Sequence, residues 1–380
     1  MVIVPCSCAQ YINQISCWNL KPDVNLTHIF VNLRKAVSNG NGADADDGLP
    51  IIYDEFKLIQ SEFTELGTGA EAEDSGGGDF FAGIAFAKIS ITKNPRLRRI
   101  HSGVFRASSR TTTSLTISEN PVLGNDPPND RQIFQLINSF TGLTEVWLTD
   151  NNITRLPDRA FGRPQRSLSW LSLIDNNIES IGDYAFHGLP ALNYLLLDGN
   201  RIDRISDKAF DFTDDSGSDG SGSDSSNQQL LRLFLRDNDL NDQSFADHTF
   251  DRLRRRLLID LTKNNLTSLR PEVFAPVFRR NGSAVILRHN PLVCDCRFKW
   301  LHDRHLLYNS SDPDRHYFVH SVQCNGSRHD NHRLNELTDK HFQHCPQDDP
   351  QELQAINCFH NNGVDYDYHQ CLNDDNNLLL

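Results

Sequence analysis

Apolar and polar residues follow one pattern three times in the middle of this chain. "LTEVWLTDNNITRLPDRAF" begins at 143, "LSWLSLIDNNIESIGDYAF" at 168 and "LNYLLLDGNRIDRISDKAF" at 192, so the starts lie 25 and 24 residues apart. Apolar residues occupy the fourth and sixth positions of each segment, Asn the ninth and Phe the last. Alternate side chains of a strand point to opposite faces. The pattern therefore predicts a short strand whose fourth and sixth positions point inward and whose third and fifth point outward.

A period of about 20–29 residues with this consensus is typical of leucine-rich repeats. The pattern continues at 230, 256 and 285, and it weakens toward the N-terminus in "KISITKNPRLRRIHSGVF" and "SLTISENPVL". We count about eight repeats over residues 51–293. The sequence predicts an α/β solenoid, a horseshoe with a parallel concave β-sheet and a cap at each end.

Two positions of the repeat have a structural role that can be assigned directly. We expect the recurring Asn to be buried where the chain leaves the strand and to satisfy backbone groups of neighbouring repeats as a ladder. We expect the recurring Phe to fill the core on the convex side. The ladder positions are Asn94, Asn120, Asn151, Asn176, Asn200, Asn238, Asn264 and Asn290. The core positions are Phe105, Phe161, Phe186, Phe210, Phe250 and Phe274.

Two acidic inserts rich in Gly and Ser interrupt the repeats, at 67–80 and 211–229. Such segments cannot bury enough apolar surface to order themselves, so we predict flexible loops. The alternative is covalent, because Ser-Gly beside acidic residues resembles the acceptor pattern for glycosaminoglycan chains. That pattern occurs at Ser75, Ser216 and Ser221.

The cysteines cluster near the ends of the chain. "NPLVCDCRFKWL" begins at Asn290, and its two cysteines could bind a metal, carry redox chemistry or close a disulfide. This run resembles the C-terminal cysteine-rich flank of extracellular leucine-rich-repeat proteins. The resemblance implies a cap over 294–346, with Trp300 on the open core. It also implies the disulfides Cys294–Cys324 and Cys296–Cys345.

The segment "PCSCAQYINQISC" is similar to the matching N-terminal flank, which normally carries four cysteines. The resemblance implies a cap over 1–50 with Cys6 bonded to Cys17, with Cys8 unpaired and with the missing cysteine upstream of Met1. Cys358 and Cys371 are then expected to close a separate loop in a tail over 347–380.

Further details resemble one particular family. They are the Asn-Pro pairs in "ITKNPRLRRIHSGVF" and "LTISENPVL", the segment "INSFTGLTEVWLTDNNITRLPDRAF" and the ending "NGSAVILRHNPLVCDCRFKWL". Together they look like the arthropod secreted proteins named after the non-catalytic subunit of Oplophorus luciferin 2-monooxygenase. The likeness spans roughly residues 5 to 346; the missing cysteine, the acidic inserts and the tail depart from it. It implies a secreted, non-catalytic, partner-binding protein.

Outward strand positions of consecutive repeats place large side chains side by side. Clustered exposed aromatics indicate an interaction surface for another protein, unless an insert or the tail folds over them. Nearby arginines could pair with an acidic partner. We call this set the aromatic patch: Trp147, Trp170, Tyr194, Leu196 and Phe234, flanked by Arg232 and Arg236.

Composition and motifs exclude several classes of function. The net charge of −13 disfavours nucleic-acid binding. No window reaches the roughly 20 apolar residues of a membrane span. We find no motif for a nucleophile, a phosphate loop or a cofactor, so we expect no enzyme and no cofactor. Metal binding by the cysteines, by the "DADDG" segment at 44–48 or by paired histidines is a less favoured alternative.

The chain starts without a secretion signal, yet nine cysteines suggest an oxidising compartment. We expect that the signal lies upstream of Met1. Glycosylation is then expected at some Asn-x-Ser/Thr motifs. The predicted function is an extracellular stabilising or recognition subunit for a protein partner; the alternatives are a matrix proteoglycan core and an adhesion or receptor ectodomain. The motifs begin at Asn25, Asn152, Asn265, Asn281, Asn309 and Asn325.

Overall fold

The computed structural model describes most of the first 345 residues. The described ranges are 2–3, 6–9, 13–40, 50–67, 80–124, 131–161, 165–212, 230–253, 255–278, 282–303, 323–324 and 332–345. Ser75, Ser216, Ser221, Asn281, Asn309, Asn325, Cys358 and Cys371 lie outside them, so the predictions for these residues stay predictions.

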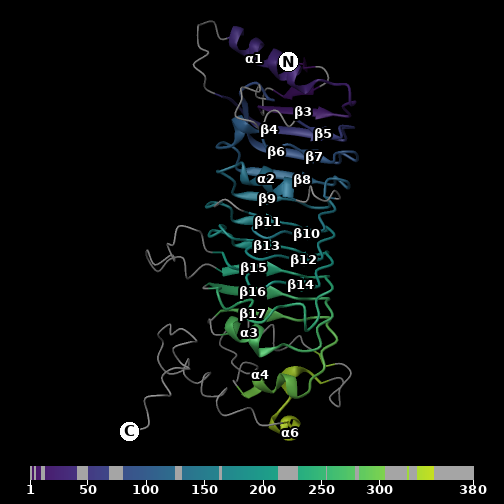
Figure 1. Cartoon of the computed structure of the whole chain (residues 1–380), viewed down its shortest axis with the longest axis vertical. Helices are drawn as coiled ribbons and strands as arrows, with labels where there is room; N and C mark the ends of the chain where they lie inside the picture. Colours follow the sequence, from purple (N-terminus) through teal and green to yellow (C-terminus); the bar gives the residue numbers. More distant parts are fainter. Residues whose placement is uncertain are drawn as a thin grey trace, which may run out of the picture.

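One long sheet runs the length of the molecule (Figure 1), and it confirms the predicted leucine-rich-repeat solenoid. Within the described ranges it has 12 strands in the order β1-β2-β3-β4-β6-β8-β9-β11-β13-β15-β16-β17. β1 to β3 pair antiparallel, and every later pair is parallel. The strands are β1 (Val2–Ile3), β2 (Cys6–Ala9), β3 (Gln14–Trp18), β4 (Ile51–Ile59), β6 (Ile84–Thr92), β8 (Ser114–Ser118), β9 (Glu145–Trp147), β11 (Trp170–Ser172), β13 (Tyr194–Leu196), β15 (Leu230–Phe234), β16 (Arg256–Asp260) and β17 (Ala284–Ile286).

Short strands and helices return the chain to the sheet after each strand. Two small parallel sheets lie on this return path, β5-β7 and β10-β12-β14. Their strands are β5 (Glu65–Leu66), β7 (Arg99–Ile100), β10 (Arg155–Leu156), β12 (Ser180–Ile181) and β14 (Arg204–Ile205). The helices are α1 (Leu26–Gly40), η3 (Arg106–Ser108), α2 (Gln132–Asn138), α3 (Pro271–Phe278), η6 (Cys296–Phe298), α4 (Lys299–Asp303), η7 (Leu334–Glu336) and α6 (Asp339–Phe342).

The recurring Asn forms the predicted ladder. Asn176 Nδ2 donates to the carbonyl oxygens of Leu148 (2.7 Å) and Leu173 (3.0 Å), and Asn176 Oδ1 accepts from the backbone N–H of Asn151 at 3.1 Å. Each buried amide therefore joins its own repeat to the preceding one. In the repeat before Asn94, Ser61 stands at the ladder position, and its N–H donates to Asn94 Oδ1 at 2.9 Å. The ladder therefore extends one repeat beyond the recurring Asn.

The recurring Phe side chains form a column through the core, as predicted. All six are at most 2% exposed. Phe186 and Phe210 lie 5.8 Å apart with an interplanar angle of 4°, and Phe210 and Phe250 lie 5.4 Å apart at 9°. Consecutive repeats thus stack the same side chain on itself, which aligns them.

Helix α1 was not predicted, and it covers the core near the N-terminus. Leu26, Phe30 and Leu33 are at most 4% exposed. The ring of Phe30 lies 4.6 Å from that of Phe81 and 5.9 Å from that of Phe56. One buried face on a 15-residue helix gives this end of the solenoid an apolar cover.

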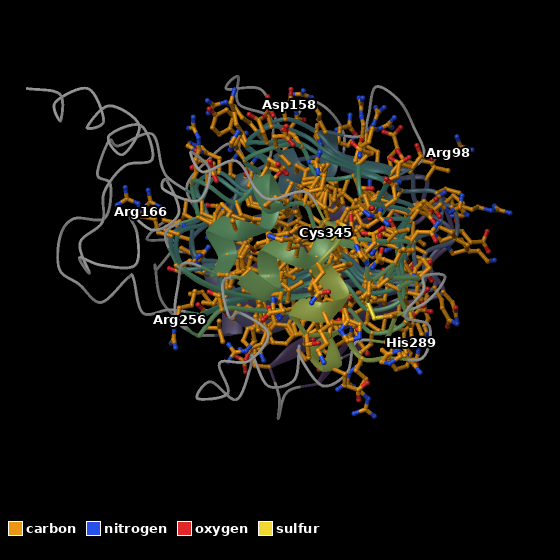
Figure 2. All side chains as sticks on the ribbon, turned by 90° about the horizontal axis from the view of Figure 1, so that it is seen from below. Arg98, Asp158, Arg166, Arg256, His289 and Cys345 are labelled. Carbon is orange, nitrogen blue, oxygen red and sulfur yellow. A yellow bond between two sulfur atoms is a disulfide. The ribbon has the colours of Figure 1, made fainter. Side chains whose placement is uncertain are left out.

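At the other end, the cap lies across the last repeat. Trp300 is 7% exposed, and its Nε1 donates to the carbonyl oxygen of Leu269 at 2.9 Å. Seen along the long axis from this end, Cys345 lies over the middle of the cross-section, whereas Asp158 and Arg98 lie at its rim (Figure 2). The cap therefore shields apolar side chains that the last repeat would otherwise expose.

Candidate partner-binding surface

Strand pairing sets the aromatic patch in two rows on the concave face. In row one, Glu145, Trp170, Tyr194 and Arg232 are successive partners on β9, β11, β13 and β15. In row two, Trp147, Ser172, Leu196 and Phe234 are partners on the same strands. The residues between the rows, such as Leu171 and Leu195, are fully buried. The outward positions therefore follow the repeat pattern.

Three rings and one guanidinium of the patch stack on one another. The ring centroids of Trp147 and Trp170 lie 5.3 Å apart, and those of Trp170 and Tyr194 lie 4.5 Å apart, with interplanar angles of 31° and 29°. The guanidinium of Arg232 lies 5.0 Å from the centroid of Tyr194. These distances are close to the strand spacing of about 4.8 Å. We call Trp147, Trp170, Tyr194 and Arg232 the concave stack.

The two flanking arginines differ in their bonding. The guanidinium of Arg236 lies 5.2 Å from the ring of Phe234 and donates to Asp198 Oδ2 from Nε (3.2 Å) and Nη2 (2.7 Å). Hydrogen bonding to Asp198 raises the pKa of Arg236. Arg232 stacks on Tyr194 but forms no ion pair within the described ranges. Of the two, Arg232 is thus the cation left to meet a partner's carboxylate.

Two polar atoms lie beneath the stack without a hydrogen-bond partner among the described residues. They are Nε1 of Trp170 and Oγ of Ser172. Leaving a buried donor or acceptor unpaired costs about 1–3 kcal/mol. The repeat pattern predicted an outward Trp170 ring, but it does not reveal that Trp170 Nε1 and Ser172 Oγ are buried and unpaired.

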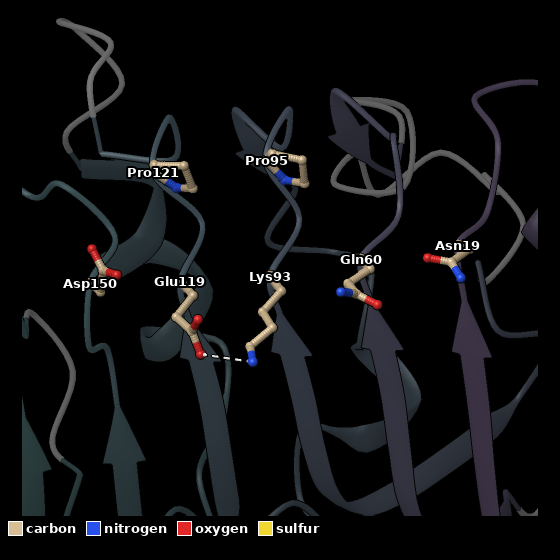
Figure 3. A pocket seen from close by; sticks show the side chains of 7 residues that line it. All are labelled: Asn19, Gln60, Lys93, Pro95, Glu119, Pro121 and Asp150. Carbon is tan, nitrogen blue, oxygen red and sulfur yellow. Dashed lines mark ion pairs between the residues drawn. The ribbon is translucent and has the colours of Figure 1, made fainter.

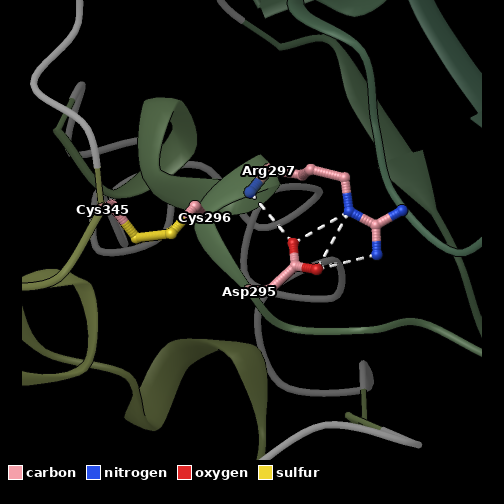
Figure 4. The surroundings of a disulfide bond; sticks show 4 residues. All are labelled: Asp295, Cys296, Arg297 and Cys345. Atoms are coloured by element: carbon pink, nitrogen blue, oxygen red, sulfur yellow. Dashed lines mark hydrogen bonds and ion pairs between the residues drawn. A yellow bond between two sulfur atoms is a disulfide. The ribbon is translucent and has the colours of Figure 1, made fainter.

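The structure also carries three disulfides: Cys6–Cys17, Cys294–Cys324 and Cys296–Cys345. Cys6 and Cys17 are register partners on β2 and β3. Beside Cys296–Cys345, Asp295 accepts from Arg297 Nε and Nη2, both at 2.9 Å (Figure 4). Cys8 is a free, half-buried thiol. Both ends of the repeat array therefore carry covalent cross-links.

Arg297 attaches the C-terminal cap to the repeats. Its Nη1 donates to Thr267 Oγ1 at 3.0 Å and to Asp242 Oδ2 at 3.4 Å. Asp242 also accepts from the hydroxyl groups of Thr267 and Ser268, at 2.5 and 2.8 Å. Burial alone raises the pKa of Asp242, but the hydrogen bonds from Thr267 and Ser268 outweigh it and lower the pKa below 3.8.

The three described glycosylation motifs differ in the freedom of their Asn. Asn265 is exposed. Asn25 is exposed, and its Oδ1 accepts from the N–H of His28 at 2.9 Å. Asn152 is half-buried, and its Nδ2 donates to the carbonyl of Pro121 at 3.3 Å. The side chain of Asn265 is therefore the most open of the three.

A shallow groove follows the ends of the first strands (Figure 3). Its volume is about 490 Å³, and Lys93 pairs with Glu119 across it at 3.7 Å. Sequence reasoning did not find this groove. In the sequence, the groove is marked only by position, because four of its residues directly precede a ladder residue. These four, Gln60, Lys93, Glu119 and Asp150, all adopt positive φ. The lining residues are Asn19, Gln60, Lys93, Pro95, Glu119, Pro121 and Asp150.

Metal and membrane features are absent from the parts of the chain that the structure describes. There, no three His, Cys, Asp or Glu side chains come close enough together to hold a metal ion. Nor does any described helix have the length and apolar character that a bilayer crossing requires.

The comparisons with known proteins give one family match and likenesses to solved structures. The leucine rich repeat family model matches residues 141–210, which contain β9, β11 and β13. The chain is similar to human 5T4, a trophoblast glycoprotein, with 16% identity and a TM-score of 0.48 over 88% of this chain and 97% of that one. It is also similar to a chain of the octameric complex of Latrophilin 3, Unc5D and FLRT2. There the identity is 20% and the TM-score 0.36, over 77% of this chain and 91% of that one. The repeat match over residues 141–210 and the parallel sheet show that this chain has a leucine-rich-repeat fold.

Proposed function

We propose that this chain is a secreted, non-catalytic subunit that binds an extracellular protein through the aromatic patch. The concave stack is the observation that carries the proposal. Aromatic and Arg side chains dominate binding energy at protein interfaces, and here four of them lie in contact on one face. Leu196 and Phe234 extend the same surface as register partners in row two.

The cross-links support an extracellular location for this function. Disulfides persist in oxidising compartments and are rare in the cytosol. Three of them stand at the two ends of the described chain. The proposed organisation has caps over 1–50 and 294–346 around repeats over 51–293, followed by a tail over 347–380. Its glycans would be carried at exposed motifs such as Asn265.

The resemblance to the arthropod family suggests the finer role of a stabilising subunit. In that role the patch would hold a smaller secreted protein whose folded state gains stability from binding. The proteoglycan alternative depends on the Ser-Gly motifs at 75, 216 and 221, and it makes the inserts the functional part instead.

The test is capture of a partner from the extracellular fluid of the source organism. The bait is the full chain, compared with a variant carrying Trp147→Ser, Trp170→Ser and Tyr194→Ser. Trp18→Ser is the matched control, because Trp18 is 59% exposed on β3 of the same sheet, outside the patch. Circular dichroism establishes that all three proteins are folded, and crosslinking with mass spectrometry maps the contact.

We expect one partner to be retained by the wild type and by Trp18→Ser, to crosslink to the concave face and to be lost by the triple variant. A partner held equally by all three proteins overturns the patch as the binding site. Loss of binding after treatment with a glycosaminoglycan lyase, with the triple variant unaffected, would favour the proteoglycan core.

A further inference from the structure

Two opposite charges stand at the ends of row one without an ion-pair partner among the described residues. They are Glu145 on β9 and Arg232 on β15. Two ion pairs lie elsewhere on this face, Arg236 with Asp198 at 2.7 Å and Lys57 with Glu55 at 3.1 Å. Lys88, two strands before Glu145 in the same row, forms none among the described residues. Three strand spacings separate Glu145 from Arg232, which places their Cα atoms about 14 Å apart.

Between these charges Trp170 and Tyr194 present their ring edges, and Trp147 extends the ring surface on the strand that carries Glu145. Trp170 and Tyr194 are register partners, so their rings stack straight across the strands at 4.5 Å, close to the strand spacing. Trp147 is the register partner of Ser172 and stacks on Trp170 diagonally, at 5.3 Å. Trp170 therefore has a ring against each face, and Tyr194 has Trp170 on one face and Arg232 on the other. The edge of an aromatic ring is the positive part of its quadrupole. This surface therefore favours carbonyl oxygens and apolar groups that lie across the edges.

An extended polyproline II segment has this chemistry. Its backbone forms no internal hydrogen bonds, so its carbonyl groups are free to meet the ring edges, and its conformation costs little entropy to fix. It advances about 3.1 Å per residue, so about 14 Å corresponds to four or five residues. The two unpaired charges match a segment with a basic and an acidic residue at that separation.

We propose that the concave stack binds a proline-rich extended peptide segment of the partner, with a basic residue at Glu145 and an acidic residue at Arg232. This inference rests on the proposed function, because it names the chemistry recognised by the same surface. The segment runs across the strands, along the long axis of the solenoid.

The test uses synthetic peptides and the full chain. One fluorescent peptide is Lys-Pro-Pro-Pro-Pro-Asp, with blocked ends, and a second has the order Asp-Pro-Pro-Pro-Pro-Lys. A third replaces the four prolines by glycines. Anisotropy titration measures the three affinities. We expect one of the two proline peptides to bind at least about tenfold more tightly than the glycine peptide, because its backbone is already extended.

Charge exchange tests the assignment of the two ends. In the double variant Glu145→Arg, Arg232→Glu, the preference between the two proline peptides should invert. Each neutral variant, Glu145→Gln or Arg232→Gln, should weaken the preferred peptide about threefold, the size of an exposed ion pair. Lys88→Gln is the control, because Lys88 is exposed in the same row on β6 and lies outside the stack; it should leave the affinity unchanged.

The possible failures are distinguishable. If no peptide binds saturably while the natural partner is still captured through the patch, the peptide inference is wrong and the proposed function stands. If the peptides bind but charge exchange does not change their preference, the assignment of the two ends is wrong. If capture and peptide binding both survive the triple Ser variant, the patch is not the site and both proposals fail.

Discussion

Two stretches of the concave face share one framework and differ in what they present. Over β6 and β8, row one holds Lys88 and Ser114 and row two holds Ser90 and Thr116, all polar and without a ring. Over β9 to β15 the same rows hold the concave stack, Leu196 and Phe234. Beneath both stretches the inward residues, such as Ile91 and Leu171, are fully buried. The repeat thus constrains the inward positions and leaves the outward ones free to encode recognition.

Replacing a ladder Asn is expected to lower the unfolding free energy more than the other changes considered below, and by a similar amount under both stretches of the concave face. Asn94→Ala removes bonds from Nδ2 to the carbonyls of Leu58 (3.3 Å) and Thr92 (3.0 Å) under the polar stretch. Asn176→Ala removes the corresponding bonds under the aromatic stretch. Each variant leaves several buried backbone groups unpaired, so we expect a loss of about 3 kcal/mol or more in unfolding free energy. Urea unfolding followed by circular dichroism measures it.

A loss below about 1 kcal/mol in one of the two variants would show that the framework is not shared. Asn265→Ala, the exposed neighbour of ladder residue Asn264, is the control, and it should change stability little.

Removing a disulfide from the C-terminal cap is expected to lower stability less. The resulting local opening should begin at the C-terminal end of the sheet, nearer the aromatic stretch than the polar one. Replacing Cys294 and Cys324 by Ala removes a cross-link between residues 30 apart, and we expect a loss of about 2–4 kcal/mol. Each repeat contacts only its neighbours, so amide exchange should accelerate in β17 and β16 before β8.

The matched control replaces Cys6 and Cys17, which are 11 residues apart at the other end. In this control, exchange should accelerate in β3 and β4 first. Uniform acceleration along the whole sheet in either variant would mean that the solenoid unfolds as one unit, without local opening at the ends.

The smallest effect is expected from pH, and only at the junction of cap and repeats. Asp242 and Asp295 have pKa values below 3.8, because burial raises each pKa less than hydrogen bonds lower it. At Asp242 these hydrogen bonds come from Thr267 and Ser268, and at Asp295 they come from Arg297. A lowered pKa in the folded state stabilises the fold above the ordinary value of the carboxyl group, and this contribution is lost as the pH falls through the lowered pKa. The melting temperature should therefore fall as the pH drops below about 4.

Asp242→Asn should have a lower melting temperature at neutral pH and a smaller change with acidification. Asp203→Asn is the control, since Asp203 pairs only with its chain neighbour Arg204, at 3.5 Å, among the ion pairs of the described ranges. Equal acid sensitivity in wild type and Asp242→Asn would contradict the role of this junction.

The fold could be predicted because its signal repeats. A single buried Asn is ambiguous, but eight at one position of the repeat, each preceded by two apolar residues at a fixed spacing, leave only one architecture. The rows of the patch followed from the same frame, as the register of Trp170 with Tyr194 shows.

Other features of the fold and the site could not be predicted, because they depend on contacts that the repeat pattern does not encode. Helix α1 lies in a segment without the repeat, and its burial depends on Phe56 and Phe81, which come later in the chain. The bond between Arg236 and Asp198 depends on side-chain geometry across two repeats separated by an insert. Cysteine pairing also required the resemblance to known flanks, because several connectivities satisfy the same spacing.

Because ring separation matches strand spacing, each repeat adds one fixed increment of length to the concave binding surface. Adding or deleting one repeat between β9 and β15 would move Glu145 and Arg232 apart or together by one step of about 4.8 Å, without altering any contact inside the remaining repeats. Such a surface can change the length of the segment it selects by recombination of repeats, in discrete steps. Point substitution then changes only the chemistry of the outward side chains within each repeat.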